Sequence, residues 1–260
     1  MECRIGDVTV YYVAHGEGTP VLVLHGAGVD HRETEACFES ALSAHHGHRR
    51  IYPDLPGMGR TAAPASLRSA DDVLDTLLSF TDEVVGPDPA LVVGHSVGAY
   101  YAQSIAARRP ARIAGLALVC PLLAGVRDVP ARRAVVAAED LGDDEFRGYF
   151  VVQTPAMLDR YERFVAPAVP LADQAAIERI GERWELSMQE GPPYDRPTLV
   201  VAGRQDSTVG YAAAVDLLDH YPQATLAVLD GAGHALPHEQ PSLLAVLIDD
   251  WLARVEGLTD

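Results

Sequence analysis

Three residues whose types together perform nucleophilic catalysis each follow an apolar run of this sequence. Ser96 is the centre of the pentapeptide Gly94–Gly98, which reads GHSVG and comes directly after an apolar run. Asp206 follows a second apolar run, and His234 lies in a Gly-rich loop after a third. A serine hydroxyl is a weak nucleophile at neutral pH, so it needs a base within hydrogen-bond reach and an acid that orients the base. We therefore predict Ser96 as the nucleophile, His234 as the base and Asp206 as the acid.

The glycines beside Ser96 indicate how its side chain is presented. The run Ala90–Val93 is typical of a buried strand, and the stretch Ala99–Arg109 is typical of a helix. A serine at a sharp strand-to-helix turn, with glycines two residues to either side, forms a nucleophile elbow, in which larger side chains would not fit. The pentapeptide is therefore expected to present the Ser96 hydroxyl at the end of the strand.

Strand-like runs alternate with segments long enough to be helices. The first two runs, Cys3–Ile5 and Val8–Val13, are predicted to form a hairpin. The other runs cover residues 21–24, 50–54, 90–93, 113–120, 198–202 and 225–229. Such alternation favours a mostly parallel sheet covered by helices on both faces. In sheets of this kind the chemistry gathers beyond the carboxyl ends of the strands, where Ser96, Asp206 and His234 all lie.

Two further loops complete a pattern known from one superfamily. His25–Gly28 reads HGAG and follows the run 21–24, and Asp54–Thr61 reads DLPGMGRT and follows Arg50–Tyr52. Together with the order serine, acid and histidine along the chain, these motifs resemble those of the α/β-hydrolase superfamily over nearly the whole chain. The resemblance implies an α/β fold with a mostly parallel central sheet, flanked by helices, and a helical cap inserted after strand six. It also implies catalysis without a metal or an organic cofactor.

The resemblance further implies an oxyanion hole built from backbone N–H groups. One donor is the N–H of Val97, and the other is the N–H of Ala27, with Gly28 as the alternative to Ala27. Such donors stabilise the negative charge of the tetrahedral intermediate, and each contributes about 100- to 1,000-fold in rate. In this family a histidine at the position of His25 holds a loop rather than reacting, and His95 is expected to pack beneath the elbow.

Asp206 is preferred over the other acids near these loops. Asp195 precedes its strand and so lies at the wrong end of it, and Asp230 is expected to organise its own turn. Some family members carry the acid after strand six, but here that position reads Cys120-Pro121-Leu122 and holds no carboxylate. Asp30, just after the HGAG loop, is interpreted either as a helix cap or as a substrate contact.

The alternation of strands and helices stops between Pro121 and Pro193. Helical pieces are predicted there over residues 130–139, 144–152, 155–165 and 171–189, with prolines and glycines between them. This divides the chain into a core, 1–120 and 194–260, and a cap, 121–193. Most large apolar side chains of the cap are expected to hold its helices together, with one or two facing the substrate. The residues assigned to the substrate pocket are Gly28, Tyr149, Met157, Tyr161 and Trp184.

The composition restricts the expected partners. Of the 260 residues, 48% are hydrophobic, and 20 basic residues against 37 acidic ones give a net charge of −17, with no lysine. A surface this acidic repels phosphate backbones and anionic lipids, so neither nucleic acid nor a membrane is an expected partner. The sequence begins without a secretory signal pattern, and no apolar run approaches the roughly 20 residues of a membrane span. The 3 cysteines are widely spaced, which suits a reducing compartment better than a disulfide framework, so we expect a cytoplasmic protein. We also expect either a monomer or a homodimer.

These features favour a serine hydrolase that acts on a small-molecule acyl substrate, namely an ester, a lactone or a related compound. Epoxide and haloalkane hydrolases have an aspartate in place of Ser96, and the proline iminopeptidase motifs HGGPG and GGSWG differ from those here. Carbon–carbon hydrolases usually carry Pro, Asn and Trp where this chain reads Val29–Glu33. Carbon–carbon hydrolysis and perhydrolysis stay open as alternatives, because they use the same triad. A receptor that binds a small molecule without turnover is a further alternative, since a fold does not fix a function.

Overall fold

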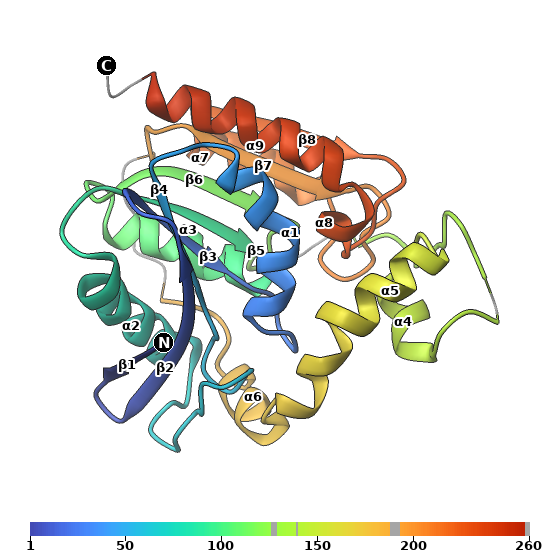
Figure 1. The fold of residues 1–260 in the computed structure, drawn as a ribbon, viewed down its shortest axis with the longest axis horizontal. Helices are drawn as coiled ribbons and strands as arrows, with labels where there is room; N and C mark the ends of the chain where they lie inside the picture. Colours follow the sequence, from blue (N-terminus) through green and yellow to red (C-terminus); the bar gives the residue numbers. More distant parts are fainter. Residues whose placement is uncertain (126–128, 139, 188–192, 258–260) are drawn as a thin grey trace.

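The structure, a computed structural model, describes residues 1–125, 129–138, 140–187 and 193–257. Within these residues, eight strands form one central sheet (Figure 1). In chain order the strands are β1 (Glu2–Ile5), β2 (Val8–His15), β3 (Thr19–Leu24), β4 (His48–Pro53), β5 (Ala90–His95), β6 (Ile113–Val119), β7 (Thr198–Gly203) and β8 (Ala224–Leu229). Across the sheet they lie in the order β1-β2-β4-β3-β5-β6-β7-β8.

Most of this sheet is parallel. β1 and β2 form an antiparallel hairpin, and β2 also pairs antiparallel with β4. All pairs from β4 onwards across the sheet are parallel, with Leu24 of β3 beside Gly94 of β5 and Gly203 of β7 beside Leu229 of β8. The predicted hairpin and the mostly parallel sheet are therefore confirmed. Because parallel strands end at the same edge of a sheet, the loops that follow β5, β7 and β8 lie along one edge.

Helices cover both faces of the sheet (Figure 1). One face carries α1 (His31–Ser43) and α9 (Pro241–Glu256), which contact each other. The other face carries α3 (Val97–Arg108) and α2 (Ala70–Phe80), which a π-helical turn at Thr81–Val85 extends. Near the last two strands lie the short helices α7 (Leu217–His220), which follows a 3-10 turn at Ala212–Asp216, and α8 (Leu236–Glu239). None of the described helices combines the length and apolar character needed to cross a membrane.

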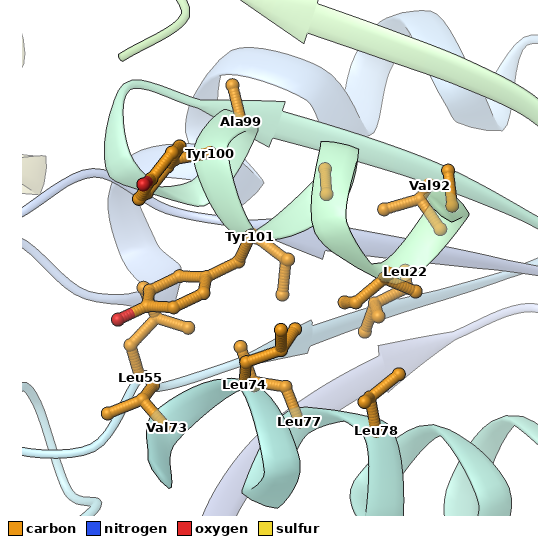
Figure 2. Packing of buried hydrophobic residues seen from close by; sticks show 14 of the residues in the cluster. Leu22, Leu55, Val73, Leu74, Leu77, Leu78, Val92, Ala99, Tyr100 and Tyr101 are labelled. Carbon is orange, nitrogen blue, oxygen red and sulfur yellow. The ribbon is translucent and has the colours of Figure 1, made fainter. Parts of the chain in front are cut away.

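The packing of α2 illustrates how the sequence pattern produces these layers. Ser69 caps the helix by accepting the backbone N–H of Asp72, and apolar side chains then recur at helical spacing. Leu74 and Leu77 are buried, and Figure 2 shows them pointing towards α3 and the sheet, where Leu22 lies. Burial of each such leucine stabilises the fold by about 1.5 to 3 kcal/mol. This layer fixes α3, and so the turn that begins it, against the sheet.

Between β6 and β7 the described chain is helical but less so than predicted. It contains α4 (Asp144–Tyr149), α5 (Pro155–Phe164), a 3-10 helix at Ala166–Leu171 and α6 (Gln174–Gly181). The helices predicted over 144–152 and 155–165 are therefore present, although the first ends at Tyr149. In place of the long helix predicted over 171–189 there is only α6, because Leu171 belongs to the preceding 3-10 turn and the chain leaves the helix after Gly181. Residues 188 and 189 lie outside the described part of the chain.

The helix predicted over 130–139 is wrong for its described part, 130–138. This segment contains no helix, and Val136 forms an isolated β-bridge with Val152. The N–H groups of Val135 and Val136 donate to the Val151 carbonyl, and Gln153 N–H donates to the Val136 carbonyl. β-branched residues favour extended backbone, and here a tertiary partner supplies the hydrogen bonds that a helix would have made internally. Residue 139 lies outside the described residues.

Candidate active site

Ser96 occupies the single residue between β5 and α3. Its backbone has φ of 56° and ψ of −119°, a conformation that residues with a Cβ rarely adopt. A Cβ on Gly98 would collide with the carbonyl oxygens of Leu24 and His25, and a Cβ on Gly94 would collide with the first turn of α3. The two glycines of the GHSVG motif are therefore required by close packing of the turn against β3 and α3, and the turn is the predicted elbow.

The structure brings the Ser96, His234 and Asp206 side chains into one chain of hydrogen bonds. His234 Nε2 lies 2.9 Å from Ser96 Oγ, and His234 Nδ1 lies 2.9 Å from Asp206 Oδ2. Because an ionised carboxylate only accepts, His234 Nδ1–H donates to Asp206, which leaves Nε2 free to accept the Ser96 hydroxyl proton. The three residues follow β5, β7 and β8, whose carboxyl ends lie at the same edge of the sheet. This arrangement is able to remove a proton from Ser96.

Asp206 is held as an anion by its surroundings. It is fully buried, and burial alone would raise its pKa, but the hydrogen bond and charge of His234 and the backbone N–H groups of Val209 and Thr208 outweigh burial, so the pKa lies below its usual value. Asp195 and Asp230 are exposed and accept hydrogen bonds from glutamine side chains instead. Of the three acids, Asp206 alone contacts His234 within the described residues.

Two backbone N–H groups beside Ser96 have no acceptor. Neither Ala27 N–H nor Val97 N–H donates a hydrogen bond to any residue in the described parts of the chain. The loop that carries Ala27 runs past Ser96, since a Cβ on Gly26 would lie 3.4 Å from Ser96 Cβ. Gly28 N–H, by contrast, donates to the Met58 sulfur at 3.3 Å. The free donors at this position are therefore those of Ala27 and Val97.

His25 and Asp30 stabilise the loops around these donors. His25 is buried; its Nδ1–H donates to the Gly26 carbonyl at 2.7 Å, and its Nε2 accepts the N–H of Leu55 at 2.9 Å. Burial lowers the pKa of His25 despite nearby carboxylates, so the ring is neutral and suited to one donated and one accepted bond. Asp30 caps α1 by accepting the N–H of Arg32. The sequence interpretations of His25 as a loop holder and of Asp30 as a cap are thus confirmed.

A buried acid that the sequence did not reveal lies behind His234. Glu33 of α1 is 1% exposed. Its Oε1 atom accepts a hydrogen bond from the Tyr149 hydroxyl at 2.9 Å and lies 3.3 Å from His95 Nδ1. His95 Nε2 in turn lies 3.0 Å from the His234 carbonyl oxygen. Burial would raise the pKa of Glu33, but His95 and His238 hold it well below the usual value. The only signal in the sequence is that Glu33 shares the inward face of α1 with Cys37, one turn later.

Glu239 is a second acid that sequence reasoning missed. It follows His234 by five residues, and its carboxylate accepts backbone N–H groups of Val151, Val152 and Gly233. Burial raises its pKa in spite of these three bonds. Nothing in the local sequence marks this role, because the contacts with Val151 and Val152 join segments more than 80 residues apart.

An apolar cavity of about 120 Å³ lies between the core and α6; its wall includes Val97, the residue after Ser96, although Ser96 itself is not among the lining residues. Its volume is below the roughly 300 to 1,000 Å³ of sites for drug-sized ligands, so it fits a small group. Ala27 and Val97 contribute to its wall. The other lining residues are Leu55, Pro56, Met58, Ala70, Val73, Tyr100, Tyr101, Leu122, Ile177, Ile180, Gly181 and Trp184.

Of the residues predicted to form a substrate pocket, one lines this cavity and the others lie elsewhere. Trp184 lies in the cavity wall, whereas Gly28, Tyr149, Met157 and Tyr161 are not among its lining residues. Met157 and Tyr161 pack instead with Phe146 and Phe150 in a separate apolar cluster formed by α4 and α5. The Tyr149 ring stands edge-on to His234, with 6.4 Å between ring centroids. Aromatic residues of this segment thus serve mainly to hold its helices together.

Two groups of potential metal ligands exist among the described residues, but their atoms are already engaged. One group contains His95, Cys120 and His234, and the second contains Asp30, His31 and Asp54. His234 uses both ring nitrogens for Ser96 and Asp206. Asp54 accepts the side chain and the backbone N–H of His31. The local hydrogen bonds therefore account for both groups without a metal.

The chain is similar to known proteins over most of its length. A family model described as "Alpha/beta hydrolase family" matches residues 21–246. The chain is 30% identical to the pimeloyl-[acyl-carrier protein] methyl ester esterase of Chromobacterium violaceum, over 89% of this chain and 94% of that protein. It is 26% identical to the magnesium-chelatase 30 kDa subunit of Rhodobacter capsulatus, over 96% and 93%. The crystal structure of an alpha/beta superfamily hydrolase from Oenococcus oeni PSU-1 is similar, with a TM-score of 0.89, 26% identity, and coverage of 98% of this chain and 99% of that one.

Proposed function

The chain belongs to the alpha/beta hydrolase family, and from that premise we propose that it is a serine hydrolase that cleaves a small ester, lactone or related acyl substrate. The observation that carries the proposal is the pair of 2.9 Å contacts that join His234 to Ser96 on one side and to Asp206 on the other. If Ser96 served only to form the turn, its hydroxyl would not need a histidine as a base. If His234 served only to pack the loop, its second nitrogen would not need the carboxylate of Asp206. The arrangement has the geometry of an activated nucleophile.

In the first step, Ser96 Oγ attacks the carbonyl carbon of the substrate while His234 Nε2 takes the hydroxyl proton. The negative charge that develops on the carbonyl oxygen is stabilised by the free N–H groups of Ala27 and Val97. The charge of Asp206 stabilises the imidazolium that forms on His234. When the carbon–oxygen bond to the leaving group breaks, His234 returns its proton to that oxygen, and an acyl-Ser96 ester is left.

In the second step, water replaces the leaving group. His234 takes a proton from the water as its oxygen attacks the acyl carbon, and the same backbone N–H groups stabilise the second oxyanion. Collapse of this intermediate releases the carboxylic acid, and the proton on His234 returns to Ser96 Oγ. The cycle uses only the side chains named here and water.

We further propose that residues 121–193 act as a cap over a core made of 1–120 and 194–260. The cavity beside Ser96 supports this, because Ile177 and Ile180 of α6 form part of its wall opposite α3. An apolar cover of this kind excludes water from the reacting groups and so strengthens the electrostatic interactions at the site. The substrate would bind between the core and this segment.

Two alternatives use the same fold. Carbon–carbon hydrolases and perhydrolases share the triad, so they differ from an ester hydrolase in the substrate they accept and not in these contacts. A receptor that binds without turnover is favoured by one observation: the relative from Rhodobacter capsulatus bears the name of a chelatase subunit, which names no hydrolytic reaction. The test of function must therefore detect both turnover and binding.

The test compares wild type with Ser96→Ala on short-chain p-nitrophenyl esters and on a lactone. We expect sustained turnover by wild type and a loss of at least about 1,000-fold in Ser96→Ala. Ser79→Ala, which changes an exposed serine on α2, is the matched control and keeps full activity. Rise of the melting temperature with an ester, together with the absence of turnover by wild type, would contradict the hydrolase and support the receptor.

A further inference from the structure

The cavity whose wall includes Val97 extends along α3 as far as Tyr101. Val97, which follows Ser96, and Tyr101, one helical turn later, both lie in its wall. Residues four apart share one face of a helix and lie about 6 Å apart along its axis. A substrate group attached to the carbonyl carbon at Ser96 therefore needs only a few bonds to reach Tyr101.

Tyr101 is a buried tyrosine whose hydroxyl has no protein partner. The residue is 5% exposed, and its hydroxyl forms no hydrogen bond with the residues that the structure describes. The Tyr100 hydroxyl accepts the N–H of Leu186 at 2.9 Å, and the Tyr194 hydroxyl donates to the Ile113 carbonyl at 2.8 Å. The Tyr101 hydroxyl has no such partner among the described residues, and because Tyr101 lies in the cavity wall, this hydroxyl is available to a ligand there.

The cavity wall around this hydroxyl is mainly apolar, and the charge that acts on it is the carboxylate of Asp71 outside the wall. Figure 2 shows the Tyr101 ring extending from α3, with its oxygen beside Leu55 and Val73, which also line the cavity. No wall residue in the described chain carries a charged side chain. Burial raises the pKa of Tyr101, so its hydroxyl stays protonated and able to donate. A carboxylate group would lose its hydration here, and no cation in the wall would compensate, which disfavours anionic substrates.

We propose that the Tyr101 hydroxyl is a specificity determinant that hydrogen-bonds an uncharged oxygen, of an ether, ketone or hydroxyl group, on the substrate. This inference rests on the proposed function, because it takes Ser96 as the reacting group. The substrate is then a small neutral ester or lactone whose otherwise apolar chain carries one oxygen a few bonds from the scissile carbonyl. Tyr101 would select this oxygen over a methylene group, which would leave the hydroxyl unpaired.

The test uses matched esters that differ only at this oxygen. Wild type and Tyr101→Phe are compared on p-nitrophenyl hexanoate and on analogues in which an ether oxygen replaces the third or fourth methylene. A second series places the same replacements in the alcohol part of hexyl acetate. In at least one series we expect wild type to prefer an oxygen-containing ester by about five- to tenfold in kcat/KM, and Tyr101→Phe to lose that preference.

Two controls separate a specific contact from a general effect. Tyr194→Phe removes a buried hydroxyl that already has a protein partner, so the preference for the oxygen-containing ester stays as in wild type. A monoester of adipic acid, which carries a carboxylate on a chain of similar length, is expected to be the poorest substrate in both wild type and Tyr101→Phe. Equal ratios in wild type and Tyr101→Phe in both series would overturn the inference, since the hydroxyl would then be solvated by water only.

Binding to the Ser96→Ala variant distinguishes this inference from the proposed function. Calorimetry gives dissociation constants of hexanamide, its ether analogues and the corresponding acetates for Ser96→Ala and for Ser96→Ala with Tyr101→Phe. Tighter binding of an ether compound by about fivefold, lost in the double variant, supports the contact even if wild type hydrolyses none of the esters. If the dissociation constants do not depend on Tyr101, the inference fails whether or not the protein is a hydrolase.

Discussion

The carboxylate of Glu239 accepts the backbone N–H of Gly233, the residue before His234, at 2.7 Å. Its other oxygen accepts the N–H groups of Val151, at 2.7 Å, and of Val152, at 3.0 Å. One partly buried side chain thus ties the loop that presents His234 to the chain just after α4. The contact is close, because a Cβ on Gly233 would collide with the Val151 side chain. The position of His234 therefore depends on the docking of this segment.

Replacing Glu239 with Gln tests that dependence. The amide offers one accepting oxygen, and its NH₂ group faces N–H donors, so at least one of the three backbone groups loses its partner. We expect unfolding free energy to fall by about 1 to 3 kcal/mol, and kcat to fall by about tenfold with a smaller change in KM. Glu162→Gln, at an exposed position of α5, is the control. Wild-type kcat and stability in Glu239→Gln would show that the clamp does not position His234.

The lowered pKa of Asp206 predicts how its contribution to stability varies with pH. Because the folded-state pKa lies below the unfolded value, the ionised form stabilises the fold above the ordinary aspartate pKa of about 3.9, and this stabilisation is lost as pH falls through the folded-state pKa. Urea unfolding of wild type and Asp206→Asn, measured at several pH values, checks this. The difference in unfolding free energy is expected to be constant above about pH 5 and to shrink below about pH 4. A difference that grows as the solution becomes more acidic would reverse the predicted sign.

The glycines of the elbow give a prediction about packing. In Gly98→Ala the new methyl group would meet the carbonyl oxygens of Leu24 and His25, which are backbone atoms of the central sheet and its loop. We expect a loss of about 1 to 3 kcal/mol in unfolding free energy, together with reduced activity. Gly148→Ala in α4 is the matched control, because a Cβ there meets open space and a helical alanine is favoured over glycine by about 0.4 to 1 kcal/mol. Similar thermal unfolding of the two variants would contradict the packing argument.

The sequence predicts the strands and the meeting of Ser96, Asp206 and His234, because each of these features is local. Each of the three residues lies in the short loop or turn that follows an apolar run, and parallel pairing then brings the ends of β5, β7 and β8 to one edge without any further information. The GHSVG pentapeptide likewise encodes its own turn through glycines whose Cβ atoms would clash.

Features that depend on distant contacts are not predictable in this way. The segment 130–138 is not helical, because Val135 and Val136 form hydrogen bonds with Val151 and Gln153, and no local pattern predicts that partner. Glu33 looks like an ordinary helix residue until His95 and Tyr149 are seen around it. Tyr101 likewise looks like a core residue of α3; both it and Tyr100 lie in the cavity wall, and the two differ because the Tyr100 hydroxyl accepts the distant N–H of Leu186.

The most direct test of the account is the intact mass of the protein after treatment with a fluorophosphonate, which reacts with activated serines. The account predicts one adduct on wild type and on Ser79→Ala, and none on Ser96→Ala, because His234 is aligned as a base with the Ser96 hydroxyl. Circular dichroism of each sample confirms that it is folded. The same adduct on Ser96→Ala, or no adduct on a folded wild type, would contradict the claim that Ser96 is the nucleophile.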